Sequence, residues 1–430
     1  MKNEFLENFI NFLKNEGFIF QSNEIYGGTS GFYDFGPLGS LIKINIKNLW
    51  LQDVVFNEKN IFLIETSLIN PKIVFEASGH LENFFDILVE CKNCHLRFKK
   101  EESKNCPQCG SNNLTRPKKF NLMFQTKIGS TGKTEGYLRP ETAQGIFVNF
   151  LNVLSSTRSK LPLGIASIGK SFRNEINPRN FIFRLREFEQ MELEFFVKPN
   201  EADYWFNYWL EKRYNWYLKI GIKKENLKKV EIPKNELPHY SKKNVDIHYN
   251  FPFGFQEIEG IANRGDYDLQ RHSKFSSKKL TYYDQKEKKS YFPYVIEPSA
   301  GVERIVFAIL IDSIDEDEID GKKRFVLRLN SKVAPLKFAI LPLVSNKKEI
   351  VNFAKNLYED LRKKFVCVYD ENGSIGRRYR RQDEIGTPWC ITVDFESLTK
   401  KDVTVRDRDT TEQIRIKIED IERFFEEKLK

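Results

Sequence analysis

The sequence FRNE at residues 172–175 and the sequence RLREFEQMELEFF at residues 184–196 decide the fold of this chain. An apolar segment leads into the first stretch, a polar connection containing Pro178 turns the chain, and the second stretch returns as a strand. We therefore predict a hairpin of two antiparallel strands. Arg173 and Glu175 lie at one end of it, where an arginine fork and a carboxylate can hold a phosphate and an adenine edge. Taken alone, this pair also fits an exposed hairpin with ordinary surface charges.

A second stretch, YFPYVIEPSAGVERIVFAIL at residues 291–310, predicts a strand followed by an apolar helix. Gly301 lies at the turn between them, and Arg304 lies in the first helical turn. A helix N-terminus with a glycine entry favours an anion site. The alternative is a buried helix in which Glu303 favours the helix dipole. Acidic groups also lie beside glycines in LRPETAQG at 138–145 and in EIEGIANR at 257–264.

Together these stretches resemble the class II aminoacyl-tRNA synthetases. The hairpin resembles their motif 2, and EPSAGVER at residues 297–304 resembles their motif 3. Residues 36–71, with a helix near 41–51 and a strand ending at Pro71, resemble motif 1, the dimer element. The segments LRPETAQGIF, EASGH, EIEGIANRGDYDL and VTVRDRDT are similar to the glycyl enzymes of the homodimeric type. The resemblance spans essentially the whole chain. SAGVER is less glycine-rich than motif 3 of many class II enzymes, which leaves the role of Glu303 open.

The resemblance implies an α+β catalytic domain with an antiparallel sheet, a small zinc-knuckle insert and a C-terminal α/β anticodon-binding domain. We place the catalytic domain at residues 1–335, the insert at 91–118 and the C-terminal domain at 336–430. The boundary follows a change of pattern near Pro335. Beyond it, strands at 337–343, 366–369 and 389–393 alternate with helices at about 347–365 and 376–384. This alternation predicts a mostly parallel sheet.

Within the catalytic domain, residues 181–183 and 192–197 show strand patterns. The stretch 200–250, rich in Tyr, Trp and Lys, predicts a helix followed by an irregular connection. Near the N-terminus, Phe5, Phe9, Phe12 and Leu13 have the spacing of an amphipathic helix.

The resemblance also implies the reaction: glycine is activated with ATP to glycyl-adenylate and transferred to the 3′ end of tRNA(Gly). Arg173 would bridge the α-phosphate and the amino-acid carboxylate, and Glu175 would contact the adenine amino group. Phe188 would stack on adenine, with Arg304 on its other face near the γ-phosphate. The catalytic residues are then Arg173, Glu175 and Arg304. The implied ATP site comprises Arg173, Asn174, Glu175, Phe183, Arg184, Leu185, Arg186, Glu187, Phe188, Glu257, Ile258, Gly301 and Arg304, of which Glu257 would hold Mg²⁺.

In the same way, the resemblance implies a glycine site. Three carboxylates would surround the ammonium, Arg264 would meet the carboxylate, and Ser299 would line the Cα. The implied substrate site comprises Glu141, Phe188, Glu189, Gln190, Met191, Glu192, Arg264, Glu297, Pro298 and Ser299. For the neighbouring Glu259, simple pairing with a nearby arginine is an equal alternative.

Two cysteine pairs predict a structural zinc site. The spacing Cys91-x2-Cys94-x11-Cys106-x2-Cys109 is that of two knuckles, and four thiolates complete a closed tetrahedral shell. The alternative, four unrelated cysteines, is improbable at this spacing. His95 is interpreted as a surface residue. Cys367 and Cys390 lie in apolar surroundings and are interpreted as buried thiols.

Four arginines in the C-terminal domain could face RNA. They are Arg377, Arg378, Arg380 and Arg381, and a solvated helix face is an equal alternative. The net charge of +9 is compatible with a polyanionic partner but does not identify one.

The chain shows no secretory signal, and its longest apolar run, residues 305–311, is too short to cross a bilayer. We therefore expect a cytoplasmic protein without a membrane partner. Two other classes remain open at this point: another class II ligase with a related anticodon domain, and an inactive synthetase-like nucleic-acid-binding subunit. The first would lack the three-carboxylate pocket and EPSAG. The second would have lost the arginines of the ATP site.

Overall fold

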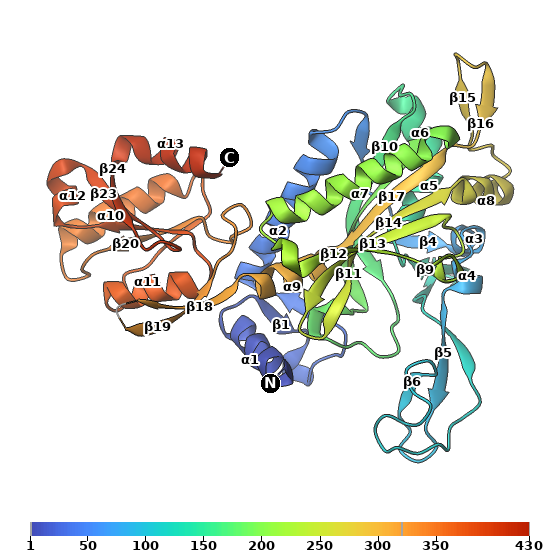
Figure 1. The fold of residues 1–430 in the computed structure, drawn as a ribbon, viewed down its shortest axis with the longest axis horizontal. Helices are drawn as coiled ribbons and strands as arrows, with labels where there is room; N and C mark the ends of the chain where they lie inside the picture. Colours follow the sequence, from blue (N-terminus) through green and yellow to red (C-terminus); the bar gives the residue numbers. More distant parts are fainter. Residues whose placement is uncertain (1, 320, 430) are drawn as a thin grey trace.

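The computed structural model describes residues 2–319 and 321–429. A larger N-terminal part and a smaller C-terminal part lie side by side, joined through the hairpin of β18 (Ile314–Ile319) and β19 (Lys322–Leu327) (Figure 1). Among the described residues, no helix has the length and apolar content that a membrane crossing requires.

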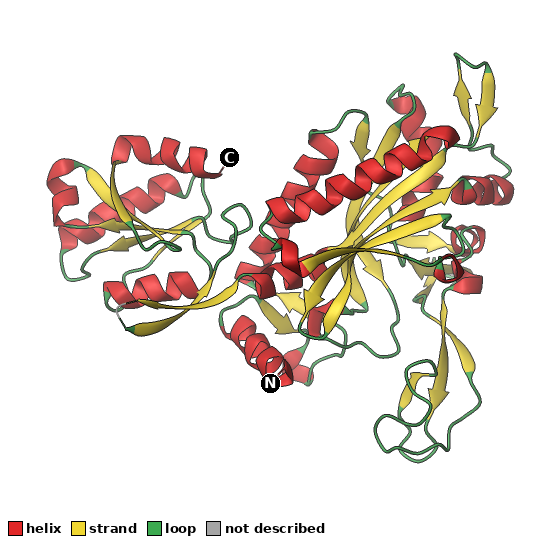
Figure 2. Ribbon diagram, viewed as in Figure 1, coloured by secondary structure: helices red, strands yellow, loops and turns green. Residues whose placement is uncertain are grey.

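A seven-stranded sheet forms the centre of the larger part, with helices on both of its faces (Figure 2). Neighbouring strands are antiparallel except β10 and β3, which are parallel. In order across the sheet the strands are β12 (Leu227–Glu231), β13 (Lys243–Phe251), β14 (Gly254–Gly265), β17 (Tyr294–Gly301), β11 (Glu187–Val197), β10 (Leu163–Phe172) and β3 (Ile61–Leu63). The predicted α+β fold with an antiparallel sheet is confirmed.

The hairpin that decides the fold is formed by β10 and β11. Their register pairs Phe172 with Glu187 and Ser171 with Phe188, so residues 173–186 form the connection at one end. The predicted strand and helix of EPSAGVER are β17 and α9 (Val302–Asp312). Both segments are therefore neighbours in the sheet, because β11 pairs with β17.

The two faces of this sheet have different covers. The main core lies on one face, under α2 (Pro37–Leu51), α7 (Ala202–Lys219) and α9, with α1 (Lys2–Asn15) packed beside them. The other face is covered at one end by α5 (Ala143–Val148), α6 (Phe150–Ser156) and α8 (Tyr267–Ser276). The remainder of that second face holds the cavity described below.

Smaller elements surround the sheet. The insert is a three-stranded sheet of β6 (Arg97–Lys99), β5 (Phe85–Glu90) and β7 (Lys118–Asn121), and it projects away from the body (Figure 1). The others are β1 (Ile19–Gln21), β2 (Tyr33–Phe35), β4 (Ile69–Pro71), α3 (Lys72–Ala77), α4 (His80–Asn83), β8 (Gln125–Ile128), β9 (Thr134–Leu138), β15 (Tyr282–Asp284) and β16 (Lys289–Tyr291).

The C-terminal part has its own sheet and core. The strand order is β21 (Cys367–Tyr369), β20 (Phe338–Pro342), β22 (Trp389–Val393), β23 (Asp402–Asp407) and β24 (Gln413–Lys417). Its helices are α10 (Lys348–Leu361), α11 (Ile375–Glu384), α12 (Phe395–Lys400) and α13 (Ile418–Leu429). Only β21, β20 and β22 run parallel, whereas β23 and β24 are antiparallel. The expected mostly parallel sheet is thus a mixed one, because β23 returns antiparallel to β22 after α12, and the short turn at residues 408–412 makes β23 and β24 a hairpin.

Two other expectations were wrong. Residues 181–183 form a 3-10 turn rather than a strand, since Asn180 and Phe181 have positive φ angles of 61° and 56° and all three apolar side chains turn into the core. The stretch 200–250 contains β12 and β13 in addition to the predicted helix. The alternation of Val245, Ile247, Tyr249 and Phe251, all buried, is the sequence signal for β13 that was missed.

Candidate active site

The second face of the sheet carries, beside α5, α6 and α8, a cavity of about 450 Å³. Its floor comes from alternate residues of neighbouring strands, because successive side chains of a strand point to opposite faces; in β14 a bulge between Glu257 and Gly260 adds one residue to this spacing. These residues are Phe188, Gln190 and Glu192 of β11, Glu297, Ser299 and Gly301 of β17, and Glu257, Gly260 and Ala262 of β14. The β10–β11 connection, the start of α9 and residues 232–240 complete the wall.

Most of the predicted site residues meet at this cavity. Those that line it are Glu141, Arg173, Glu175, Phe183, Arg184, Leu185, Phe188, Gln190, Glu192, Glu257, Glu297, Ser299, Gly301 and Arg304. Residues separated by more than 160 positions in the sequence are thereby brought together. The predicted site residues that do not line the cavity are Asn174, Arg186, Glu187, Glu189, Met191, Ile258, Arg264 and Pro298.

Strand alternation explains several of these corrections. Glu187, Glu189 and Met191 lie on the face of β11 opposite Phe188 and Glu192. Glu189 is bound there by Lys43 at 2.6 Å and Lys47 at 3.0 Å, and Glu187 lies 2.9 Å from Lys170. Met191 and Ile258 are buried in the main core, and Pro298 lies between two cavity residues of β17.

The β10–β11 connection explains two more corrections. The backbone N–H of Asn174 donates to the carbonyl of Leu122 at 2.8 Å, which fixes the connection from outside the cavity. Arg186 donates from Nε to the carbonyl of Glu175 at 3.1 Å and from Nη1 to the carbonyl of Ser30 at 2.7 Å. Both residues therefore support the connection rather than face a ligand.

Two arginines dominate one end of the cavity. Arg304 donates from Nη1 to the carboxylate of Glu257 at 3.2 Å, and its guanidinium lies 4.4 Å from the centre of the Phe183 ring. Arg173 donates from Nε to the carbonyl of Pro140 at 3.1 Å and lies 5.3 Å from the centre of the Phe188 ring. Both arginines line the cavity, and within the described part of the chain these contacts use only some of their N–H groups, so others are available to a phosphate.

Glu303 also borders the cavity, but its carboxylate is held by protein groups. It accepts a hydrogen bond from Lys43 of α2 at 2.7 Å and another from the backbone N–H of Glu189 at 2.9 Å. The role that the sequence left open is therefore structural: Glu303 links α9 to α2 and to β11. Glu259 is structural in the same way, since it binds Arg213 and the hydroxyl of Tyr217, each at 2.7 Å, on the far face of the sheet.

At the other end of the cavity Glu192 is held by four donors. Its Oε1 accepts from Ser299 Oγ at 2.6 Å and from Gln190 Nε2 at 2.8 Å. Its Oε2 accepts from the backbone N–H of Thr142 at 2.8 Å and from the Thr142 hydroxyl. The carboxylate therefore has a fixed orientation, and Ser299 is oriented with it.

Glu141 and Glu297 complete a trio of buried carboxylates. Glu141 lies 3.4 Å from His80 Nε2 and accepts from Gln144 at 2.9 Å. Glu297 accepts from Arg264 Nη1 at 2.9 Å. Three acidic groups around one small space favour a ligand that carries positive charge.

Arg264 itself lies behind this trio. Its Nε and Nη2 donate to Asp268, each at 2.8 Å, and the ring of Tyr240 covers the guanidinium at 3.8 Å. Only 1% of its surface is exposed. The expected direct contact between Arg264 and a substrate carboxylate is therefore not the geometry observed; Arg264 orients Glu297 instead.

Burial and mutual repulsion set the charge state of the trio. Burial, with the neighbouring Glu192 and Glu141, raises the pKa of Glu297 to about 8 although Arg264 opposes the shift. Burial and Glu141 likewise raise the pKa of Glu192. For Glu141, burial is outweighed by His80, Arg264 and Gln144, so its pKa is lowered. Glu297 and Glu192 thus hold their protons to higher pH than free glutamates do, and a cation bound beside them would favour loss of those protons.

Sequence reasoning missed several residues of this site. His80 lies in the EASGH segment and Gln144 in PETAQG, so both were visible as motif members without a role. Tyr240, Asn244 and Asp246 line the cavity without any motif signal. Burial, followed by the charge of Glu257, raises the pKa of Asp246 to about 7.

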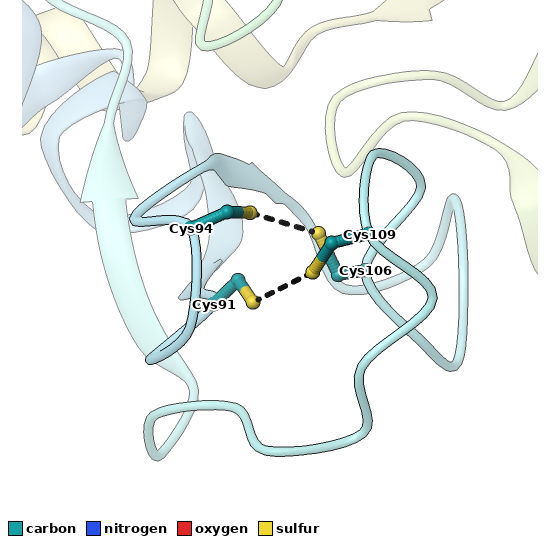
Figure 3. Close-up of side chains that lie close together, drawn as sticks. All are labelled: Cys91, Cys94, Cys106 and Cys109. Atoms are coloured by element: carbon teal, nitrogen blue, oxygen red, sulfur yellow. Dashed lines mark hydrogen bonds between the residues drawn. The ribbon is translucent and has the colours of Figure 1, made fainter.

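The four cysteines of the insert converge as predicted (Figure 3). Their sulfur atoms all lie within 4.8 Å of one another, with Cys91 to Cys109 at 3.5 Å and Cys94 to Cys106 at 3.4 Å. The two knuckles have the same form, because each first cysteine accepts a backbone N–H four residues later, from His95 and Gly110. The side chain of His95 is exposed beside Glu90, which agrees with a surface role.

In the C-terminal part the arginines of α11 do not form one free surface. Arg378 is buried and donates to the carbonyls of Pro342, Asp370 and Leu343. Arg381 binds Asp370 and, like Arg377 and Arg380, is exposed. The interpretation as a common RNA-facing cluster is therefore wrong for Arg378.

Two family models match the chain. Residues 124–313 match the class II core domain of tRNA synthetases (G, H, P, S and T), and residues 337–428 match an anticodon binding domain. Glycine–tRNA ligases are similar over nearly the whole length. That of Caldanaerobacter subterraneus subsp. tengcongensis is 49% identical, with 97% of each chain covered. That of Borrelia hermsii is 51% identical, with 97% of this chain and 96% of the relative covered.

The chain belongs to the glycine–tRNA ligase family. A third member, from Malacoplasma penetrans, is 48% identical, with 97% of this chain and 96% of the relative covered. The resemblance seen in the motifs is thereby confirmed, and with it the class II fold. Membership also argues against the other class II ligases, and the retained arginines of the cavity argue against an inactive subunit.

Proposed function

We propose that this chain activates glycine with ATP and transfers it to the 3′ end of tRNA(Gly). The observation that carries the proposal is that one cavity has side chains of opposite charge at its two ends. Arg173 and Arg304 stand at one end, and three buried carboxylates with Ser299 stand at the other. A zwitterion with a small side chain fits between them, with its carboxylate towards Arg173 and its ammonium among the carboxylates.

The residues present suit an in-line displacement. In the first step an oxygen of the glycine carboxylate forms a bond to the α-phosphorus, and the bond from that phosphorus to the pyrophosphate oxygen breaks. Arg173 and Arg304 offset the charge that develops on the phosphate oxygens. In the second step a ribose hydroxyl of tRNA attacks the glycyl carbonyl, and AMP leaves. No protein nucleophile is needed, because alignment supplies much of the rate enhancement.

The cavity also fits a divalent cation. A Cβ atom added at Gly260 would lie 3.4 Å from Asp246 Oδ1 and 3.7 Å from Glu257 Oε1, so the missing side chain leaves space between two carboxylate oxygens. Oxygen ligands of this kind are those that Mg²⁺ prefers. We assign Glu257 and Asp246 as its ligands, and the cation would neutralise phosphate charge when ATP binds.

We propose a structural zinc ion for the cysteine cluster. The fit rests on four sulfur atoms at tetrahedral spacing and on the small core beside them, which contains Val89 and Phe98 as its buried apolar side chains. So small a core gives little stability without a metal. Metal analysis of freshly purified protein should give about one zinc per chain. Cys106→Ser should lose that zinc and have a markedly lower unfolding temperature. Its rate of adenylate formation should change little by comparison.

We further propose the domain division at residue 335, a homodimer formed through α2 and the motif 1 region, and a cytoplasmic location. Two hydrophobic cores support the division, since they lie on either side of residues 335–337 apart from Ile385, which packs in the first core. Exposed apolar residues support the dimer: Ile44 on α2, Phe56 in the π-helical turn Gln52–Phe56 that follows it, and Leu63 on the edge strand β3. The free cysteines agree with a reducing compartment.

Charging of total bacterial tRNA, measured for each amino acid in turn, tests the proposed function. Glycine alone should be attached. A chain ending at residue 335 should still form glycyl-adenylate if it stays folded and dimeric, and it should charge tRNA poorly. Attachment of another amino acid in place of glycine would refute the proposal.

A further inference from the structure

The insert returns from its cysteine cluster to the ATP end of the cavity. The insert and the two residues that flank its sheet, Phe84 and Leu122, meet the β10–β11 connection, the segment that carries Arg173 and Glu175. From the flanking residues, the Phe84 ring lies 5.5 Å from the Arg173 guanidinium, and the Leu122 carbonyl accepts the N–H of Asn174 at 2.8 Å. From the insert itself, Lys99 lies 3.7 Å from Glu175, and Glu102 lies 3.4 Å from Arg179. The insert and its base therefore contact the connection along its length.

Glu175 is fixed along its backbone but not at its carboxylate. Its N–H donates to the Arg173 carbonyl at 2.7 Å, and its own carbonyl accepts from Arg186. The carboxylate oxygen Oε2 is buried and has no hydrogen-bond partner within the described part of the chain. The cation that approaches this oxygen is Lys99 of the insert, at 3.7 Å.

Lys99 is itself held in place. Its Nζ lies 2.5 Å from Asp86 of β5, and its side chain is only 15% exposed. The preceding residue, Phe98, is buried in the core of the insert against Val89 and the cysteines. The position of the ammonium is thus set by the insert and not by the cavity.

Resting on the ATP site proposed above, we propose that Lys99 is a positioning residue that aims the Glu175 carboxylate at the adenine amino group. A half-buried carboxylate without its cation is costly, and it turns towards water or another cation. Arg186, whose Nε already binds the backbone of Glu175, is the nearest alternative. Without Lys99 the carboxylate would turn away from the orientation in which it accepts a hydrogen bond from the adenine amino group.

This inference predicts a selective defect. Lys99→Met keeps the length and apolar stem of the side chain and removes the charge. The KM for ATP in ATP–pyrophosphate exchange should rise roughly tenfold, the effect of one misplaced charge-assisted hydrogen bond. The KM for glycine and kcat should stay unchanged. Lys99→Arg should restore the ATP value, because it returns the cation.

Base discrimination supplies a second readout that a loss of folding would not produce. Guanine carries an oxygen acceptor where adenine carries the amino group, so an aimed carboxylate repels GTP and binds ATP. The ratio of kcat/KM for ATP to that for GTP should therefore fall in Lys99→Met. Arg97→Met is the matched control, since Arg97 lies on the same strand, pairs with Glu90 at 2.8 Å and is 69% exposed.

Glu175→Gln separates this inference from the proposed function. If Glu175→Gln raises the KM for ATP but Lys99→Met does not, the inference is overturned while the ATP site stands. If Glu175→Gln has no effect, the assignment of Glu175 fails and the inference fails with it. If both variants raise the KM and the double variant is no worse than Glu175→Gln alone, the inference is supported. An equal rise in the KM values for ATP and glycine, or in Arg97→Met, would contradict it.

Discussion

Arginines in the cavity and arginines in the C-terminal part occur in equally motif-like segments, yet they are used differently. In VTVRDRDT, Arg406 binds both oxygens of Asp383 at 2.8 and 3.0 Å, and Arg408 donates to the carbonyls of Gly386 and Leu329. Both are buried, and their donors are engaged by protein. Arg173 and Arg304, in contrast, border a cavity and keep donors for a ligand. Burial and hydrogen bonding therefore distinguish a structural arginine from a ligand-binding one, whereas the motif does not.

The same C-terminal network joins the two parts of the molecule. Arg324 of β19 binds Asp383 at 2.9 Å and the carbonyl of Arg408 at 3.0 Å. Asp383 thus receives two arginines, one from each side of the junction. These ion pairs stabilise the domain arrangement, and they leave few N–H donors of these arginines for direct RNA recognition.

The largest expected effect tests the structural role of the C-terminal arginines. Arg406→Ala leaves buried Asp383 with one partner fewer, and removal of a buried ion-pair partner costs about 3–5 kcal/mol. Chemical denaturation should show this loss, while exchange per folded molecule should stay normal. Arg423→Ala, in an exposed pair with Asp420, should change the free energy of unfolding by less than about 1 kcal/mol. A stable Arg406→Ala protein that fails only in tRNA charging would instead mark Arg406 as an RNA ligand.

The next effect tests the cavity side. Arg173→Ala should lower glycine-dependent ATP–pyrophosphate exchange by about 10²–10³, since it removes one donor to the transition state. Its free energy of unfolding should change little. Lys170→Ala is the control, because Lys170 lies on the same hairpin but pairs with Glu187 outside the cavity. Near-normal exchange in Arg173→Ala would show that the connection is assigned wrongly.

A smaller effect tests the charge state of the three buried carboxylates. Because burial and the neighbouring carboxylates raise the pKa of Glu297 to about 8, Glu297 carries a proton below that pH and must lose it when an ammonium binds. The kcat/KM for glycine should therefore rise between pH 6 and 8, with at most about tenfold change per pH unit. Glu297→Gln should flatten this profile as well as weaken glycine use. A glycine profile that is flat in the parent protein, with ATP saturating, would contradict the raised pKa.

The sequence predicted much of this site, for identifiable reasons. FRNE, EFEQME and EPSAGVER are long local patterns, so their strands, their helix and the convergence of Arg173 and Arg304 could be inferred. Strand alternation could also have excluded Glu189 and Met191, since Phe188 and Glu192 already fixed the inner face of β11. That inference needed only the rule that side chains of a strand alternate between its two faces.

Other features depend on contacts between distant segments and could not be read locally. Glu259 is structural because Arg213, in α7, lies beneath it. Asp246 joins Glu257 through the pairing of β13 with β14, and β13 was not predicted as a strand. Arg264 is covered by Tyr240, which belongs to a connection without regular structure. Each case requires the sheet order, which no single motif contains.

The most direct test of the central claim compares glycine and alanine in ATP–pyrophosphate exchange. Alanine has every group of glycine and one methyl more, so a yielding apolar pocket would favour alanine by about 1–3 kcal/mol. In the proposed binding mode the ammonium lies among the carboxylates, and Ser299 is fixed by its 2.6 Å hydrogen bond to Glu192, so a methyl would clash or leave that hydroxyl unsatisfied. We predict that alanine supports very little exchange. Comparable kcat/KM values for alanine and glycine in the parent protein would contradict the account.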